Sequence, residues 1–172
     1  MKKTLCSLLT LAALTALSPA AFARVPLGQA RPMTVELAKQ LVSAAKRASC
    51  SAPAGQCSGV FAVADDAGVV IYMEAVDGVI AAAPDLAMKK ATAAAVWRRP
   101  TDVFRKAVDD KRNTSYADGS FRDMTTSPGG IPLFRNGRVV GAIGIAAVGS
   151  YGAVKQVEKA VMAKATELFG KQ

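Results

Sequence analysis

The segment that decides the fold is Ile131-Pro-Leu-Phe-Arg-Asn-Gly-Arg-Val-Val-Gly-Ala-Ile-Gly-Ile145. Two largely apolar runs flank Asn136-Gly137, a dipeptide that supplies the two positive-φ positions of a two-residue hairpin turn. Pro132 has no N–H to donate, so we expect its strand to lie at an edge of the sheet. Gly141 and Gly144 carry no side chain, which lets another backbone or a ligand approach closely. The segment therefore predicts an antiparallel hairpin with a closely packed second strand.

A second hairpin and four helices complete the pattern. Residues 59–66 and 69–75 are short apolar runs that meet at Asp66-Ala67-Gly68, which is typical of a hairpin. Thr34 and Thr101 are the expected N-caps of two helices, and Pro100 ends the helix before Thr101. Apolar periodicity and these boundary residues predict helices at about 34–48, 85–99, 101–111 and 153–169. Because hairpins rather than crossovers join the strands, the fold class is α+β, with a central antiparallel β-sheet flanked by helices.

The first 23 residues are typical of a cleavable secretory signal peptide. A cationic start, Met1-Lys2-Lys3, precedes an apolar run from Leu5 to Leu17 and the small-residue site Ala21-Phe22-Ala23. This apolar run is shorter than the roughly 20 residues that a membrane-spanning helix needs. We therefore expect export to the periplasm or secretion. The mature chain then consists of an extended arm at 24–33 and one domain at 34–172.

Composition restricts the class of protein and its partners. A chain of 172 residues that is 51% hydrophobic and 20% charged predicts one folded domain and excludes a disordered tail. The net charge of +9 would fit nucleic acid, but no Lys and Arg run with interleaved aromatics occurs, and export separates the protein from that partner. Nucleic acid is therefore not an expected partner. The alternatives are a basic surface without a specific role and attraction to anionic small molecules or envelope surfaces.

Two cysteines of the mature chain indicate a disulfide. Cys50 and Cys57 bracket a loop-like segment, and cysteines so placed in an oxidising compartment are expected to pair, stabilising the fold by about 2–3 kcal/mol. A metal pair or a redox dithiol lacks support, because the spacing is not C-x-x-C and the sequence contains no histidine. The lack of histidine also excludes Ser-His-Asp and Cys-His catalysis. No metal site is predicted.

Three motifs carry a resemblance to a known family. They are Asp85-Leu-Ala-Met-Lys-Lys-Ala-Thr-Ala93 followed by Pro100-Thr101, then Pro128-Gly-Gly-Ile-Pro-Leu133, then Gly137-Arg-Val-Val-Gly-Ala-Ile-Gly-Ile145. Over about residues 34–169 the chain resembles the GlcG/HbpS-like family of haem-binding and related proteins, whose module also forms the C-terminal part of PduO-type proteins. The resemblance implies a profilin-like fold and a homo-oligomer, from dimer to octamer.

The same resemblance implies a function and an alternative. Family members bind haem or corrinoid-like ligands, and exported relatives take part in haem sensing or scavenging. We therefore expect an exported protein that binds haem, or a related small molecule with carboxylates, and that has a membrane sensor as a candidate partner. The alternative is an enzyme or accessory protein that acts on a small organic acid in a catabolic pathway, with Lys89 or a carboxylate transferring a proton. Whether the chain is an enzyme stays open at this point.

Eight residues are the candidate ligand contacts. Lys89 and Arg98, with their neighbours Lys90 and Arg99, could pair with haem propionates or a substrate carboxylate, or could form an ordinary cationic helix face. Gly129 and Gly130 could offer backbone N–H groups to an anion, or could simply shape the turn into the strand. Thr92 could contact the ligand or bond its own helix backbone. The full set is Lys89, Thr92, Arg98, Met124, Pro128, Gly129, Gly130 and Ile131.

The sequence departs from the family pattern at two places. Relatives tend to reach an acidic pair before the last helix, where this chain has Lys155-Gln156-Val157-Glu158. Haem would also bind without a histidine ligand to its iron. The remaining iron ligands are water, a threonine hydroxyl, or a side chain from Tyr72, Met73, Met88, Tyr116, Met124 and Tyr151.

Overall fold

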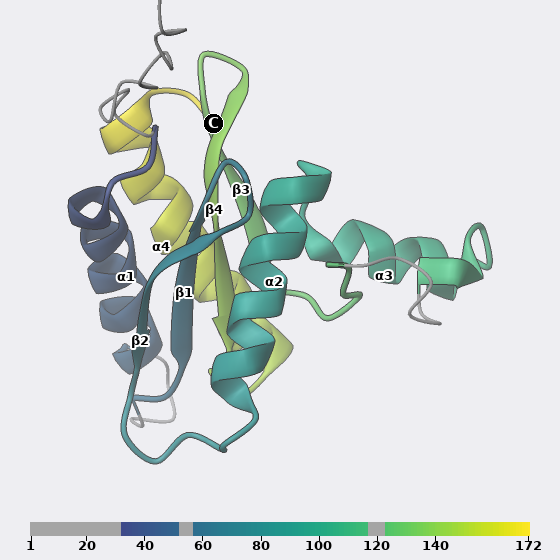
Figure 1. The fold of residues 1–172 in the computed structure, drawn as a ribbon. Helices are drawn as coiled ribbons and strands as arrows, with labels where there is room; N and C mark the ends of the chain where they lie inside the picture. The colour runs from purple at the N-terminus through teal and green to yellow at the C-terminus, as the bar shows by residue number, and fades with distance from the viewer. Residues whose placement is uncertain (1–31, 52–56, 117–122) are drawn as a thin grey trace, which may run out of the picture.

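The computed structural model describes residues 32–51, 57–116 and 123–172 (Figure 1). Along the chain the elements are α1 (Val35–Cys50), β1 (Val60–Asp65), β2 (Val70–Ala75), α2 (Ala83–Trp97), α3 (Thr101–Asp109), the 3-10 helix η1 (Thr114–Tyr116), β3 (Gly130–Arg135), β4 (Arg138–Ala146) and α4 (Tyr151–Phe169). The predicted order of helices and hairpins is confirmed, with small shifts at the helix ends. The predicted signal peptide lies outside the described residues.

The four strands form one antiparallel sheet in the order β2-β1-β4-β3. Strands β1 and β4 pair in the centre, which joins the two hairpins into a continuous sheet. Strand β3 lies at an edge, where Pro132 was expected. Asn136 and Gly137 have φ values of 52° and 74°, so the turn between β3 and β4 has the predicted positive-φ geometry.

Helices cover both faces of the sheet, and the two faces use side chains of different size. Helices α1 and α4 lie together on one face and α2 lies on the other (Figure 1). On the α1 and α4 side, large buried residues such as Leu41, Phe61 and Ile143 form the main core. On the α2 side the buried layer is built largely of alanines, which lets the helix lie close to the strands. This arrangement is the predicted α+β fold.

The N-terminal arm contributes to the core at its last position. Of the arm predicted at 24–33 the structure describes Pro32 and Met33, and Met33 is only 1% exposed. Its side chain packs in the main cluster with residues of α1 and the sheet. Thr34 then caps α1 as expected, because its hydroxyl accepts a hydrogen bond from the N–H of Leu37. The packed domain therefore includes Met33.

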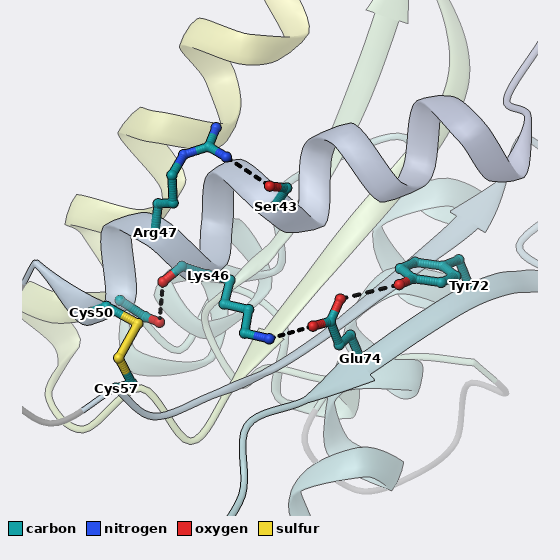
Figure 2. Close-up of polar contacts among 8 residues, drawn as sticks. Ser43, Lys46, Arg47, Cys50, Cys57, Tyr72 and Glu74 are labelled. Atoms are coloured by element: carbon teal, nitrogen blue, oxygen red, sulfur yellow. Dashed lines mark hydrogen bonds and ion pairs between the residues drawn. A yellow bond between two sulfur atoms is a disulfide. The ribbon is translucent and has the colours of Figure 1, made fainter.

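The C-terminal end of α1 is held by one disulfide and by a polar contact with β2 (Figure 2). The predicted disulfide between Cys50 and Cys57 is present and fixes the chain that leaves the helix. One turn earlier, Lys46 donates to the carboxylate of Glu74 on β2, which also accepts from the hydroxyl of Tyr72. The ion pair of Lys46 with Glu74 holds α1 to the edge strand β2, and the disulfide joins the end of α1 to the segment before β1.

Helix α3 extends away from the sheet (Figure 1) and begins differently from the prediction. The sequence predicts Thr101 as its N-cap, but Pro100 occupies the cap position without a side-chain hydrogen bond. Thr101 is the first helical residue and is fully buried, so its hydroxyl serves another segment instead. No helix within the described ranges is both long and apolar enough to cross a membrane.

Candidate functional site

The bend at Pro128–Gly130 is tied to two neighbouring elements. The Thr101 hydroxyl accepts a hydrogen bond from the N–H of Gly130 at 2.9 Å and donates one to the carbonyl of Ser127 at 2.7 Å. On the other side, the N–H of Ile145 in β4 donates to the carbonyl of Gly129. Gly129 has a φ of 111°, a conformation that side chains rarely adopt. The N–H of Gly130 is thus engaged by Thr101, which favours the alternative that these glycines shape the turn into the strand.

Lys90 is buried directly behind this bend. Lys90 extends from α2 and is only 4% exposed. Its ε-amino group donates a hydrogen bond to the carbonyl of Ile145 at 2.7 Å. Burial lowers the pKa of this amine from its usual 10.5 to about 8, and the nearby carboxylate of Glu158 opposes part of that shift. From the sequence, Lys90 was expected either to pair with a ligand carboxylate or to belong to an ordinary cationic helix face; its burial excludes a solvated face, and its amine is bound to a backbone carbonyl.

The buried amine predicts a distinctive pH dependence of stability. Because the folded-state pKa lies below the unfolded value, the unfolded chain binds more protons between about pH 8 and 10.5, and stability rises with pH in that window. The free energy of unfolding of the wild type should gain up to about 3 kcal/mol there relative to Lys90→Met, at about 1.4 kcal/mol per pH unit. Urea denaturation of both proteins from pH 7 to 10.5 measures this difference. Parallel curves for the two proteins would contradict a buried, titrating Lys90.

A groove opens on the solvent side of the same bend. Its volume is about 600 Å³, and we call it the Pro128 groove; it is lined by Asp102, Arg105, Lys106, Asp109, Asp110, Pro128 and Tyr151. Helix α3 supplies one wall, and the first residue of α4 supplies the other through Tyr151, which is 57% exposed. Within α3, Arg105 pairs with Asp109 at 2.9 Å and Lys106 pairs with Asp110 at 3.1 Å. The groove therefore presents a phenol and two cations that are already balanced by carboxylates.

Lys155 connects the two walls of the Pro128 groove. Its ε-amino group lies 2.8 Å from a carboxylate oxygen of Asp102 on α3 and 2.7 Å from one of Glu158 on α4. It also lies 5.3 Å from the centre of the Tyr151 ring, within the range of a cation–π contact. Burial opposes the charged form of Lys155, but the two carboxylates outweigh it and raise the pKa of the amine. Lys155 thus stabilises α3 against α4 and positions Tyr151.

Some of the eight predicted ligand contacts lie at or near the Pro128 groove. Pro128 lines the groove, while Gly129, Gly130 and Ile131 are buried behind it. Met124 lies in the preceding loop and is half-buried. The charged residues of α3 were not predicted to line a site, because opposite charges four residues apart are also the pattern of an ordinary solvated helix.

The other predicted residues lie elsewhere. Lys89 is exposed and pairs with Asp85 at 2.9 Å, so it faces solvent rather than the groove. Thr92 donates to the carbonyl of Gly68 at 2.8 Å, which ties α2 to the first hairpin turn instead of to its own helix backbone. Arg98 lies at the C-terminal end of α2, in a separate pocket. The buried amine on α2 is that of Lys90, and Lys90 does not line the groove.

Among the tyrosines considered as iron ligands, Tyr151 is the one that lines the Pro128 groove. Tyr72 is engaged by Glu74, as Figure 2 shows. Tyr116 packs edge-to-face against Phe104, with ring centres 5.3 Å apart. Of these three tyrosines, Tyr151 therefore has the position and the exposure that a ligand in the Pro128 groove requires.

Comparisons with known proteins agree with this fold. The family described as "Haem degrading protein HbpS-like" matches residues 33–165. Protein GlcG of Escherichia coli K12 is 31% identical over 84 residues, which are 49% of this chain and 60% of GlcG, so the match spans less than two thirds of that relative.

Solved structures of similar proteins superpose over most of the chain. A double mutant of HbpS from Streptomyces reticuli has a TM-score of 0.67 and 26% identity, covering 89% of this chain and 98% of HbpS. PduOC in complex with heme has a TM-score of 0.66 and 22% identity, covering 77% of this chain and 94% of PduOC, and at this identity it establishes the fold alone. Since the family match extends over most of the sequence, the chain belongs to the HbpS-like family.

Proposed function

We propose that the chain binds haem, or a related tetrapyrrole, in the Pro128 groove. The observation that carries the proposal is the meeting of Tyr151, Arg105 and Lys106 around a groove of about 600 Å³ beside the Pro128–Gly130 bend. This volume lies within the usual range of small-molecule sites. The family description and the complex of PduOC with heme support haem as the ligand.

The groups in the groove fit the polar parts of haem. A tyrosine phenol is a known protein ligand of haem iron, and Tyr151 is exposed in the groove. Arg105 and Lys106 would hold the propionate carboxylates, which would compete for them with Asp109 and Asp110. Lys155 would keep the Tyr151 ring in place through its cation–π contact. A bound haem would bring a redox-active iron to this surface.

Titration with haemin tests the proposal. We expect a saturable Soret shift at low micromolar wild-type protein, and an affinity at least about tenfold lower for Tyr151→Phe, because even the loss of a group that supports a metal ligand weakens metal binding by about 10- to 100-fold. Tyr72→Phe is the matched control, since Tyr72 is bound to Glu74 away from the groove. Absence of a saturable shift in the wild type would exclude haem. Equal affinities of the wild type and Tyr151→Phe would exclude Tyr151 as the iron ligand.

The proposal includes an exported, oligomeric protein. The disulfide between Cys50 and Cys57 supports an oxidising compartment such as the periplasm, because such bonds are rare in reducing ones. The homo-oligomer and the membrane sensor are predictions that rest on the family resemblance. Native mass spectrometry of protein purified from its own periplasm would report the number of copies and any retained ligand together.

A further inference from the structure

A second concave site lies at the end of the sheet where both hairpins turn. Figure 1 shows the two turns and the C-terminal end of α2 at this same end of the molecule. A pocket of about 360 Å³ is lined there by Asp66, Arg98, Gly137, Arg138 and Val139. An adjoining depression of about 520 Å³ shares Asp66, Arg138 and Val139 and adds Arg135. No residue that lines the Pro128 groove takes part in either.

The charges at this end are not balanced. Among the described residues that line the two depressions, three are arginines, Arg98, Arg135 and Arg138, and one carries a carboxylate, Asp66. Across the ranges that the structure describes, none of the three arginines forms an ion pair, whereas Arg105 and Arg112 each pair with an aspartate. Arg135 and Arg138 are also directly opposite in the β3–β4 register, and like charges so placed destabilise a hairpin. An anion at this end would relieve that repulsion.

The three arginines line different depressions. Arg98 lines the smaller pocket, Arg135 lines the larger depression, and Arg138 lines both. The guanidinium carbon of Arg135 lies 4.9 Å from the centre of the Phe169 ring, so a cation–π contact holds this side chain. The smaller pocket is therefore left with Arg98 and Arg138. Two guanidinium groups in one concavity can bind carboxylate or phosphate oxygens in bidentate fashion.

Arg98 adopts an unusual backbone conformation to reach this pocket. It ends α2 with a φ of 54°, in the left-handed region where helix ends ordinarily use glycine. A cation near a helix C-terminus is favourable, but this would not require the left-handed position. Strained residues that persist in a fold often serve a binding role, and here the strained residue lines the pocket.

We propose that the pocket of Arg98 and Arg138 binds a small dianion, either a phosphoryl compound or a dicarboxylate. Its volume of about 360 Å³ suits a small molecule at the lower end of the usual range. Asp66 at the rim accepts hydrogen bonds, which favours ligands that carry a hydroxyl or ammonium group besides the acid groups. The site is independent of haem.

Calorimetric titration at constant ionic strength tests the site with two separate probes, inorganic phosphate and succinate. We expect saturable one-to-one binding of at least one probe, and an affinity at least tenfold lower for Arg138→Gln. A preference for phosphate would assign a phosphoryl ligand, and a preference for succinate would assign a dicarboxylate. Arg47→Gln is the matched control, because it removes the same charge from an exposed position on α1 (Figure 2).

Arg98→Gly separates binding from folding. Glycine relieves the left-handed strain, so this variant should melt at a higher temperature than the wild type and yet bind the anion at least tenfold more weakly. The proposal is overturned if neither probe binds the wild type. It is also overturned if Arg47→Gln loses as much affinity as Arg138→Gln, because that result would indicate attraction by net charge alone.

Discussion

Gly144→Val is expected to destabilise the protein by more than about 3 kcal/mol, beyond the usual range for overpacked cores. Gly144 lies in β4 where α2 crosses the sheet, and an added Cβ would come within 2.6 Å of the backbone nitrogen of Ala91 and even closer to the carbonyl oxygen of Ala87. Both obstacles are helix backbone, so no rotamer change relieves them. The helix would have to move away from the sheet and open the alanine layer beneath it.

Gly152→Ala is the matched control for this prediction. Gly152 lies in the first turn of α4, and an added Cβ would meet only the Ser150 hydroxyl oxygen at 3.7 Å. Alanine favours a helix over glycine by up to about 1 kcal/mol, so this variant should be neutral or stabilised. Urea denaturation gives both values from the midpoint at constant slope. A wild-type midpoint for Gly144→Val would contradict the close approach of α2 to β4.

The sequence predicted those parts of the fold that depend on neighbouring residues. Asn136-Gly137 specifies its turn through the φ values of two adjacent residues, and Pro132 assigns its strand to an edge through one missing N–H. The central pairing of β1 with β4 joins segments about 80 residues apart and follows from burial on both faces of the sheet. Local turn chemistry carries no information about that pairing, so the strand order came only from the structure.

The buried lysine shows why part of the candidate site was missed. Lys89 and Lys90 are adjacent residues of the same type, and α2 has so many alanines that its apolar and polar faces are poorly distinguished. The decisive feature is the spacing of Lys90 from Ala83 and Ala87, which places it on the face that contacts the sheet. The Pro128–Gly130 bend was predicted because proline and glycine mark a turn wherever they occur. The wall from α3 was not predicted, because its charges have the spacing of a solvated helix.

Thr101→Val is expected to cost about 2–4 kcal/mol and to loosen the bend on which the Pro128 groove depends. The substitution keeps the shape of a fully buried side chain but removes the hydroxyl, leaving the N–H of Gly130 and the carbonyl of Ser127 without their partner. Each unpaired buried group costs about 1–3 kcal/mol, and the carbonyl of Ser127 is only partly buried, so its share lies at the lower end of that range. Because Pro128 lies between the two residues that Thr101 ties, haemin affinity should fall along with stability.

Thr101→Ser isolates the hydroxyl from the packing of the same side chain. Serine keeps both hydrogen bonds and loses one methyl group, which is worth about 1 kcal/mol when buried. We therefore expect thermal and urea denaturation to rank the proteins as wild type, then Thr101→Ser, then Thr101→Val, and haemin affinity to follow the same order. The reverse order of the two variants would mean that methyl packing, and not the hydrogen bonds of the hydroxyl, holds the bend.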